Sequence, residues 1–191
     1  MISFAEFNVA LHGLLRLARF DAGFAGFFDL SPRGARRSFR LAVLLLPIVL
    51  FLMHLNANWP EDTDMGRVVF SELIGYVLTW SCFPLLLLAA ARVIDRESRI
   101  YAAIAIYNWL TVLVIGLQLP ISIATYYGLD PDWAGGFADV VLLFVTCLEF
   151  FAFRRLLEIG IELTIALVAV DFTLSRMLEL LTYGLAHASL F

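Results

Sequence analysis

The chain contains no lysine, so arginine supplies every fixed positive charge. Charged residues of either sign make up only 16% of the 191 residues, whereas a soluble domain has about 25%. Hydrophobic residues reach 62%, well above the roughly 45–50% of soluble domains. This composition argues against an ordinary soluble domain and predicts a single membrane domain with short loops.

Cysteine is also scarce, and Cys82 and Cys147 both lie inside apolar runs, where cysteine acts as a small buried hydrophobe. Their spacing indicates no metal, haem or iron–sulfur site. The chain lacks a Walker loop, a dinucleotide fingerprint, a Gly-x-Ser-x-Gly elbow, an HExxH motif and a Glu-x-x-His motif. We therefore expect no catalytic residue, no metal, no cofactor and no enzymatic activity.

Five long apolar runs are present, and each reaches the roughly 20 residues that a helix needs to cross a bilayer. The runs are continuous and do not alternate, which favours helices over barrel strands. The predicted fold is an all-α, polytopic transmembrane helical bundle preceded by an amphipathic interfacial helix. The predicted spans are residues 39–58, 68–92, 100–127, 133–153 and 156–186.

The arginines mark alternate connections between these runs. Eleven of the thirteen precede the first run or lie between the second and third or the fourth and fifth, and only Arg67 and Arg176 fall elsewhere. The two other connections carry acidic residues: Glu61, Asp62 and Asp64, then Asp130 and Asp132. Positive charge is retained on the cytoplasmic side of a bilayer. We therefore predict a multi-pass protein of the bacterial inner membrane, with a cytoplasmic amino terminus and a periplasmic carboxyl terminus.

Residues 2–20 have apolar side chains at spacings near three and four, interrupted by polar ones, as in an amphipathic helix. The helix is too polar to span, and we expect it to lie in the inner headgroup region or against a partner. The expected apolar stripe is Phe4, Phe7, Leu11 and Leu14.

A basic linker follows, and Ser31 with Pro32 is a good start for a helix that continues into the first span. We therefore divide the chain into a cytoplasmic segment, residues 1–38, and a five-helix membrane domain, residues 39–191. Because the basic residues lie on one predicted side, anionic lipid of the inner leaflet is the expected counterpart, and nucleic acid is not. The expected headgroup contacts are Arg16, Arg19, Arg36, Arg37 and Arg40.

Asp171 is the main intramembrane candidate, because it lies near the middle of the last span with no opposite charge within a turn. Two interpretations stand: a carboxyl group that carries protons, or a neutral, hydrogen-bonded carboxyl that fixes helix packing. Either one predicts that Asp171 points into the bundle or into a partner interface. The expected contacts are polar groups of the third span, Asn108 or Gln118.

Other acidic side chains near the predicted cytoplasmic side are secondary candidates. Glu149 lies one turn inside the end of the fourth span and could pair with Arg92, Arg96, Arg154 or Arg155. Glu158 and Glu162 are four residues apart, which fits either an interfacial ladder of ion pairs or a site of paired carboxylates.

Short segments resemble a known family. Residues 27–31 (FFDLS), 37–39 (RSF), 105–109 (AIYNW) and 153–174 are similar to small bacterial membrane proteins of the Yip1-like family. The resemblance covers the organisation of residues 25–185. It implies five spans, a cytoplasmic amino terminus and a non-enzymatic role, and it supplies no catalytic residue.

The leading functional hypothesis is a non-enzymatic scaffold, assembly factor or accessory subunit that packs against other membrane protein subunits. The alternative is a small transporter or proton-handling subunit that uses the buried Asp171 together with Asn108 and Gln118. Five spans cannot form two equal halves, which argues against an inverted-repeat transporter.

The predicted topology is tested by cysteine labelling in intact cells. A cysteine at Thr63 should react with a membrane-impermeant reagent from the periplasm. Ser98→Cys should react only after the cytoplasmic side is opened, because the segment around it carries three arginines. Labelling of Ser98→Cys from the periplasm would contradict the five-span arrangement.

Overall fold

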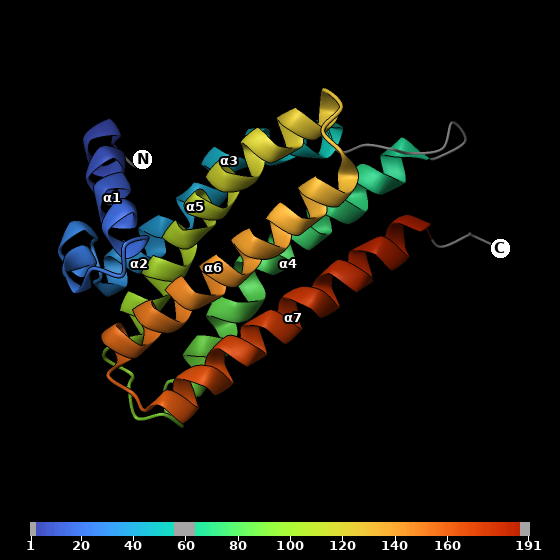
Figure 1. The fold of residues 1–191 in the computed structure, drawn as a ribbon. Helices are drawn as coiled ribbons and strands as arrows, with labels where there is room; N and C mark the ends of the chain where they lie inside the picture. Colours follow the sequence, from blue (N-terminus) through green and yellow to red (C-terminus); the bar gives the residue numbers. More distant parts are fainter. Residues whose placement is uncertain (1–2, 56–63, 188–191) are drawn as a thin grey trace.

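Seven α-helices and one short 3-10 helix form the part of the chain that the computed structural model describes, residues 3–55 and 64–187 (Figure 1). No β-strand occurs in those residues, so the expectation of an all-helical fold is confirmed. The elements are, in chain order, α1 (Phe4–Leu17), η1 (Ala22–Phe27), α2 (Pro32–Ser38), α3 (Arg40–Leu55), α4 (Met65–Ala90), α5 (Ile100–Tyr126), α6 (Pro131–Leu157) and α7 (Ile161–His187).

Four helical stretches are long and apolar enough to cross a membrane: Pro32–Leu55, which joins α2 to α3, Met65–Ala90, Ile100–Tyr126 and Pro131–Leu157. The predicted boundary between residues 38 and 39 falls inside the first of them. α7 matches the 27-residue length of α6 but carries charged side chains in its interior, and it is not among the four. The fifth crossing therefore stays a prediction. Position 63 and the last residues of the first predicted span, 56–58, lie outside the described residues.

The long helices lie side by side (Figure 1), and α5 contacts more of the other elements than any other helix does. α5 contacts α1, α2, α3, α4 and α6, whereas α7 packs mainly against α4 and also contacts α6. Half of the α5 span is buried, against at most 28% in the three other candidate spans. The outer helices thus turn most of their apolar side chains outward, as expected for helices surrounded by lipid.

Helix ends follow local sequence signals. The Ser31 hydroxyl accepts a hydrogen bond from the Gly34 backbone N–H at 3.1 Å, which caps α2 as the Ser-Pro pair predicts. The prediction of a last span starting at residue 156 is wrong, because residues 156–157 belong to α6. Glu158 has a φ of 51°, and this left-handed conformation ends α6 three residues before α7 begins at Ile161.

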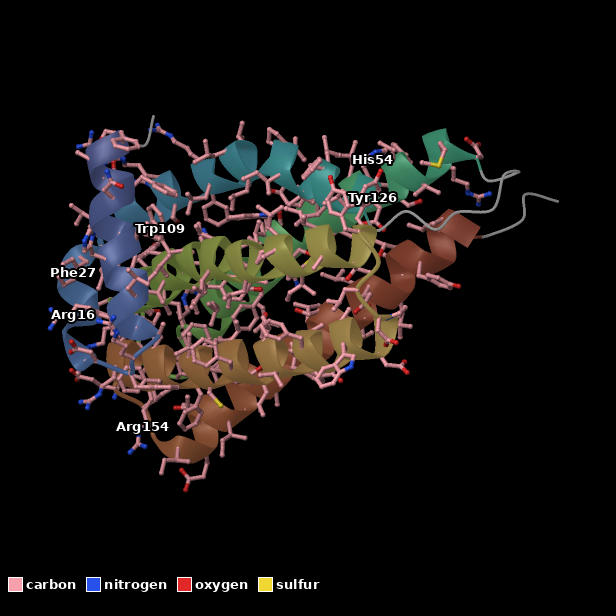
Figure 2. All side chains as sticks on the ribbon, turned by 45° about the horizontal axis from the view of Figure 1, so that its top comes forward. Arg16, Phe27, His54, Trp109, Tyr126 and Arg154 are labelled. Carbon is pink, nitrogen blue, oxygen red and sulfur yellow. The ribbon has the colours of Figure 1, made fainter. Side chains whose placement is uncertain are left out.

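One end of the bundle holds α1, α2 and the α4–α5 and α6–α7 connections, and we call it the arginine end (Figure 1). Arg16 and Arg154 lie there, whereas His54 and Tyr126 lie at the opposite end (Figure 2). Arg96 donates to the carbonyl oxygen of Leu157 at 2.8 Å, which caps the last turn of α6 and ties the two connections together.

α1 runs crosswise to the long helices (Figure 2). Its inner face carries Ala10, Leu14 and Leu17, all buried. Of the expected apolar stripe, Phe4 is 82% exposed and Leu11 is also exposed, whereas Leu14 faces the protein. The inward-facing stripe is rotated relative to the expected one, and α1 packs against η1 and α5. The position of this helix at the membrane surface stays a prediction.

The segment between α1 and α2 is held by carboxylate hydrogen bonds. Asp21 accepts from the Gly23 backbone N–H at 2.8 Å and from Arg16 Nε at 2.6 Å, and these two contacts lower the pKa of Asp21. The Ser31 hydroxyl donates to Asp29 at 2.6 Å and lowers the pKa of Asp29. Both carboxyl groups are therefore charged at neutral pH.

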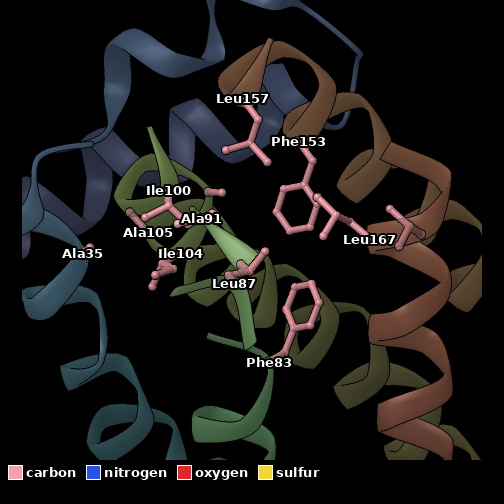
Figure 3. Close-up of a cluster of buried hydrophobic side chains, with 12 residues drawn as sticks. Ala35, Phe83, Leu87, Ala91, Ile100, Ile104, Ala105, Phe153, Leu157 and Leu167 are labelled. Atoms are coloured by element: carbon pink, nitrogen blue, oxygen red, sulfur yellow. The ribbon is translucent and has the colours of Figure 1, made fainter. Parts of the chain in front are cut away.

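Buried side chains from α4, α5, α6 and α7 fill the bundle toward the arginine end (Figure 3). Phe83 of α4 stacks on Phe153 of α6 with ring centroids 5.9 Å apart, and Leu87 and Leu157 lie in the same cluster. The side chains of this cluster fill the space between the helices near the arginine end.

The close approach of α4 and α7 depends on Gly75. A Cβ atom at this position would lie 2.4 Å from Cγ2 of Thr182. Gly75→Ala should therefore lower the free energy of unfolding by about 1–3 kcal/mol, measured by detergent-induced unfolding of the purified protein. Gly116→Ala is the matched control, because nothing lies within 4 Å of a Cβ there, and it should be neutral or slightly stabilising. Equal stability of the two variants would contradict the packing of α7 on α4.

Candidate functional site

Two long helices meet through a polar contact. The Tyr107 hydroxyl of α5 donates a hydrogen bond to Oδ1 of Asp171 in α7 at 2.9 Å. Asp171 is half-buried and therefore points into the bundle, as the sequence predicts. The hydroxyl satisfies a carboxyl group that would otherwise be surrounded by apolar side chains, which is the condition for placing such a group inside a bundle.

A second carboxyl group joins this contact from α6. Glu149 is 6% exposed, and its carboxyl group is within hydrogen-bonding reach of Asp171. Oε1 of Glu149 has no hydrogen-bond partner among the described residues. Within the described ranges Glu149 forms no ion pair, so the predicted pairing with an arginine is wrong. The arginines named for it lie at the arginine end: Arg92, Arg96, Arg154 and Arg155. We call Tyr107, Glu149 and Asp171 the carboxyl cluster.

A groove of about 630 Å³, lined by both polar and apolar side chains, lies between α3, α4, α5 and α7, farther from the arginine end than the cluster. Thr79, Thr111 and Ser175 line the part of this groove that is nearest to the cluster. Thr111 lies four residues after Tyr107, and Ser175 lies four residues after Asp171, in both cases away from the arginine end. Thr79 lies four residues before Phe83 of α4, again away from the arginine end. Farther out, the groove is lined by polar side chains of three helices, namely Glu72, Gln118, Glu179 and Thr182.

The cluster is closed on the side of the arginine end. The Phe83 ring lies 4.8 Å from the Tyr107 ring and also contacts Phe153, which is one turn from Glu149 along α6. Beyond these rings the space is occupied by the apolar core shown in Figure 3. Phe83 and Phe153 therefore separate the cluster from the arginine end.

The expected partners of Asp171 are not the observed ones. Asn108 is fully buried, and its Nδ2 donates to the Ser38 hydroxyl of α2 at 2.9 Å, on another side of α5. Gln118 lines the outer groove. Because consecutive helical residues are rotated by about 100°, Tyr107 rather than Asn108 faces α7.

Sequence reasoning missed Tyr107, although its spacing carried a signal. Tyr107, Thr111 and Gln118 are separated by four and seven residues, so they share one helical face. Asn108 and Gln118 are ten residues apart, which places them about 80° from each other. The polar face of α5 could therefore have been traced through Tyr107.

The remaining predicted residues lie apart from the carboxyl cluster. Glu162 is exposed at the start of α7, and Glu158 pairs with Arg99 at 2.7 Å instead of forming a carboxylate pair. Among the described residues, no group of three or more His, Cys, Asp and Glu side chains could hold a metal ion. The predicted headgroup residues all lie at the arginine end: Arg16, Arg19, Arg36, Arg37 and Arg40.

Two substitutions at Asp171 test whether its hydrogen bond stabilises the bundle, since leucine removes the acceptor and asparagine keeps it. Asp171→Leu should lower the free energy of unfolding by about 1–2 kcal/mol, because the Tyr107 hydroxyl and Glu149 lose their partner in a buried site. Asp171→Asn keeps an acceptor for Tyr107 and should stay within about 0.5 kcal/mol of the parent. Unfolding in mixed micelles measures both, with the exposed Asp139→Leu as control. Equal stability of Asp171→Leu and the parent would show that the contact does not hold α7 in place.

No family model, curated protein or solved structure matches this chain. The resemblance to Yip1-like proteins therefore stays a prediction, and the function is argued from the site alone.

Proposed function

We propose that this protein is a five-span inner-membrane protein that binds and releases protons at the carboxyl cluster. The observation that carries this proposal is the contact of Asp171 with Tyr107 and Glu149, one helical turn from the hydroxyl side chains that line the groove. Ionisable side chains inside membrane bundles commonly mark proton or ion pathways. Of the two functional hypotheses that the sequence suggests, this is the second, a small transporter or proton-handling subunit.

The fifth crossing by α7 is supported by how its charges are arranged. Asp171 is turned toward Tyr107, and Arg176 pairs with Glu179 at 2.7 Å. A charge that faces the bundle or is paired costs much less in a membrane than one that faces lipid. α7 also has the length of a span and packs along α4.

The proposed orientation places the arginine end in the cytoplasm, because positive residues are retained there. The faces of α1 support a position at the membrane surface. Leu15 lies on an exposed apolar stripe with Phe4 and Leu11, while Arg16 lies on another face of the helix and Arg19 follows its last turn. α1 thus has one face packed on the protein, one exposed apolar face and basic residues beside them. Such a helix fits the boundary between lipid tails and water.

The two carboxyl groups of the cluster are proposed to share one proton. A hydrogen bond between two carboxyl groups needs a proton on one of them, since a carboxylate only accepts. Asp171 already accepts from Tyr107, which stabilises its charged form. Glu149, with one oxygen unpartnered in an apolar setting, is then the protonated member.

The groove provides the proposed route for proton exchange with the periplasm. Hydroxyl groups of Thr79, Thr111 and Ser175 lie between the cluster and the outer part of the groove. The Phe83 and Phe153 rings block the route to the cytoplasm in this conformation. Transfer across the membrane therefore requires a second conformation in which this barrier opens.

The accessory-subunit hypothesis remains a prediction. The exposed apolar side chains of α7, such as Met177 and Leu180, suit a partner helix as well as they suit lipid. Co-purification of a stoichiometric complex in mild detergent would favour this role.

Proton flux into proteoliposomes tests the proposal. Vesicles containing the protein and a trapped pH-sensitive dye should acidify faster than empty vesicles when a potassium diffusion potential drives protons inward. Asp171→Asn should reduce the rate at least tenfold, because an amide cannot exchange the proton. Asp139→Asn, the same change at an exposed site of α6, should leave the rate unaltered.

Two outcomes would defeat the proposal: a parent rate no higher than that of empty vesicles, or an unchanged rate in Asp171→Asn. Infrared spectroscopy gives a second measurement, independent of transport. The carbonyl band of a protonated carboxyl group should be present in the parent and lost in Glu149→Gln.

A further inference from the structure

Four arginines line a cup of about 550 Å³ at the arginine end: Arg33, Arg36, Arg37 and Arg40. Their spacings of three, four and seven residues place them on one face of the helical stretch that joins α2 to α3. Like charges at such spacings repel one another and destabilise a helix. Such an arrangement is expected where an anion sits between the guanidinium groups.

The backbone beneath the cup is held firmly by the opposite face of the helix. A Cβ atom at Gly34 would lie 1.9 Å from the Asp29 carbonyl oxygen, so the helix touches the preceding loop directly. Ala35 and Ser38 are buried, and Ser38 accepts the hydrogen bond from Asn108 of α5. The arginines are therefore carried by a rigid support, which favours a defined binding site.

The protein itself neutralises only part of this charge. Arg37 forms an ion pair with Glu6 of α1 at 2.5 Å, and Asp29 is near enough to attract Arg33 and Arg37. Within residues 3–55 and 64–187, no ion pair involves Arg36 or Arg40. The four arginines thus face two carboxylates, and the cup keeps a net positive charge.

We propose that this cup binds the phosphate group of an anionic phospholipid headgroup. Guanidinium groups bind phosphate oxygens in a bidentate manner, and several can surround one phosphate. The lipid origin is favoured by α1, which is joined to the cup through the Glu6–Arg37 pair. Its exposed stripe, Phe4, Leu11 and Leu15, indicates that lipid tails begin at this depth beside the cup.

Native mass spectrometry of the full-length protein in detergent tests this assignment by titration with phosphatidylglycerol and with zwitterionic phosphatidylcholine. Phosphatidylglycerol should bind more tightly. The double variant Arg33→Gln/Arg36→Gln should weaken its binding roughly thirty-fold, about fivefold for each arginine. These two side chains are exposed and form no ion pair, so the variant should fold.

The matched control is Arg154→Gln/Arg155→Gln, which removes the same charge from two exposed positions at the same end that form no ion pair and lie outside the cup. It should weaken phosphatidylglycerol binding less than threefold. Equal losses in both double variants would mean diffuse attraction without a site, and would overturn the proposal. Displacement of the lipid by millimolar inorganic phosphate would overturn its lipid part, since the cup would then bind a soluble phosphate.

Discussion

Two neighbouring side chains of α5 connect this helix to opposite sides of the bundle. Tyr107 donates to Asp171 of α7, and Asn108 donates to Ser38 of α2. In a membrane the helices gain little from hydrophobic association, because lipid tails are as apolar as the side chains. Interhelical hydrogen bonds and close packing therefore determine which helices lie together and at what rotation.

These contacts divide the bundle into two unequal parts. Toward the arginine end, Phe83, Leu87 and Phe153 form a dry core, and arginines bind the carbonyl oxygens at the end of α6. Toward the opposite end, α7 approaches α4 closely at Gly75, but polar side chains leave a groove between the helices. The carboxyl cluster lies at the boundary between these parts. In the proposed function, protons reach the cluster through the groove and not through the apolar core, and this asymmetry is its physical basis.

The arginines have different tasks according to their position. Arg96 caps a helix terminus, where its charge also interacts favourably with the helix dipole. Arg37 connects α1 to α2 through Glu6. Arg36 and Arg40 face the cup without such partners, so their charge is directed outward. A chain without lysine thus uses the planar guanidinium group both for internal hydrogen bonds and for the proposed contact with phosphate.

By itself the sequence determined the class of structure and the grouping of charge. Continuous apolar runs of span length favour helices, which satisfy their own backbone hydrogen bonds without water, and Ser31 with Pro32 marks a helix start. The tertiary structure alone decided which polar groups meet. The partners Tyr107, Glu149 and Asp171 come from three helices, and the rotation of each helix depends on packing at places such as Gly75 and Phe83. A rotation by one residue, about 100°, exchanges Tyr107 for Asn108, and hydropathy does not contain that information.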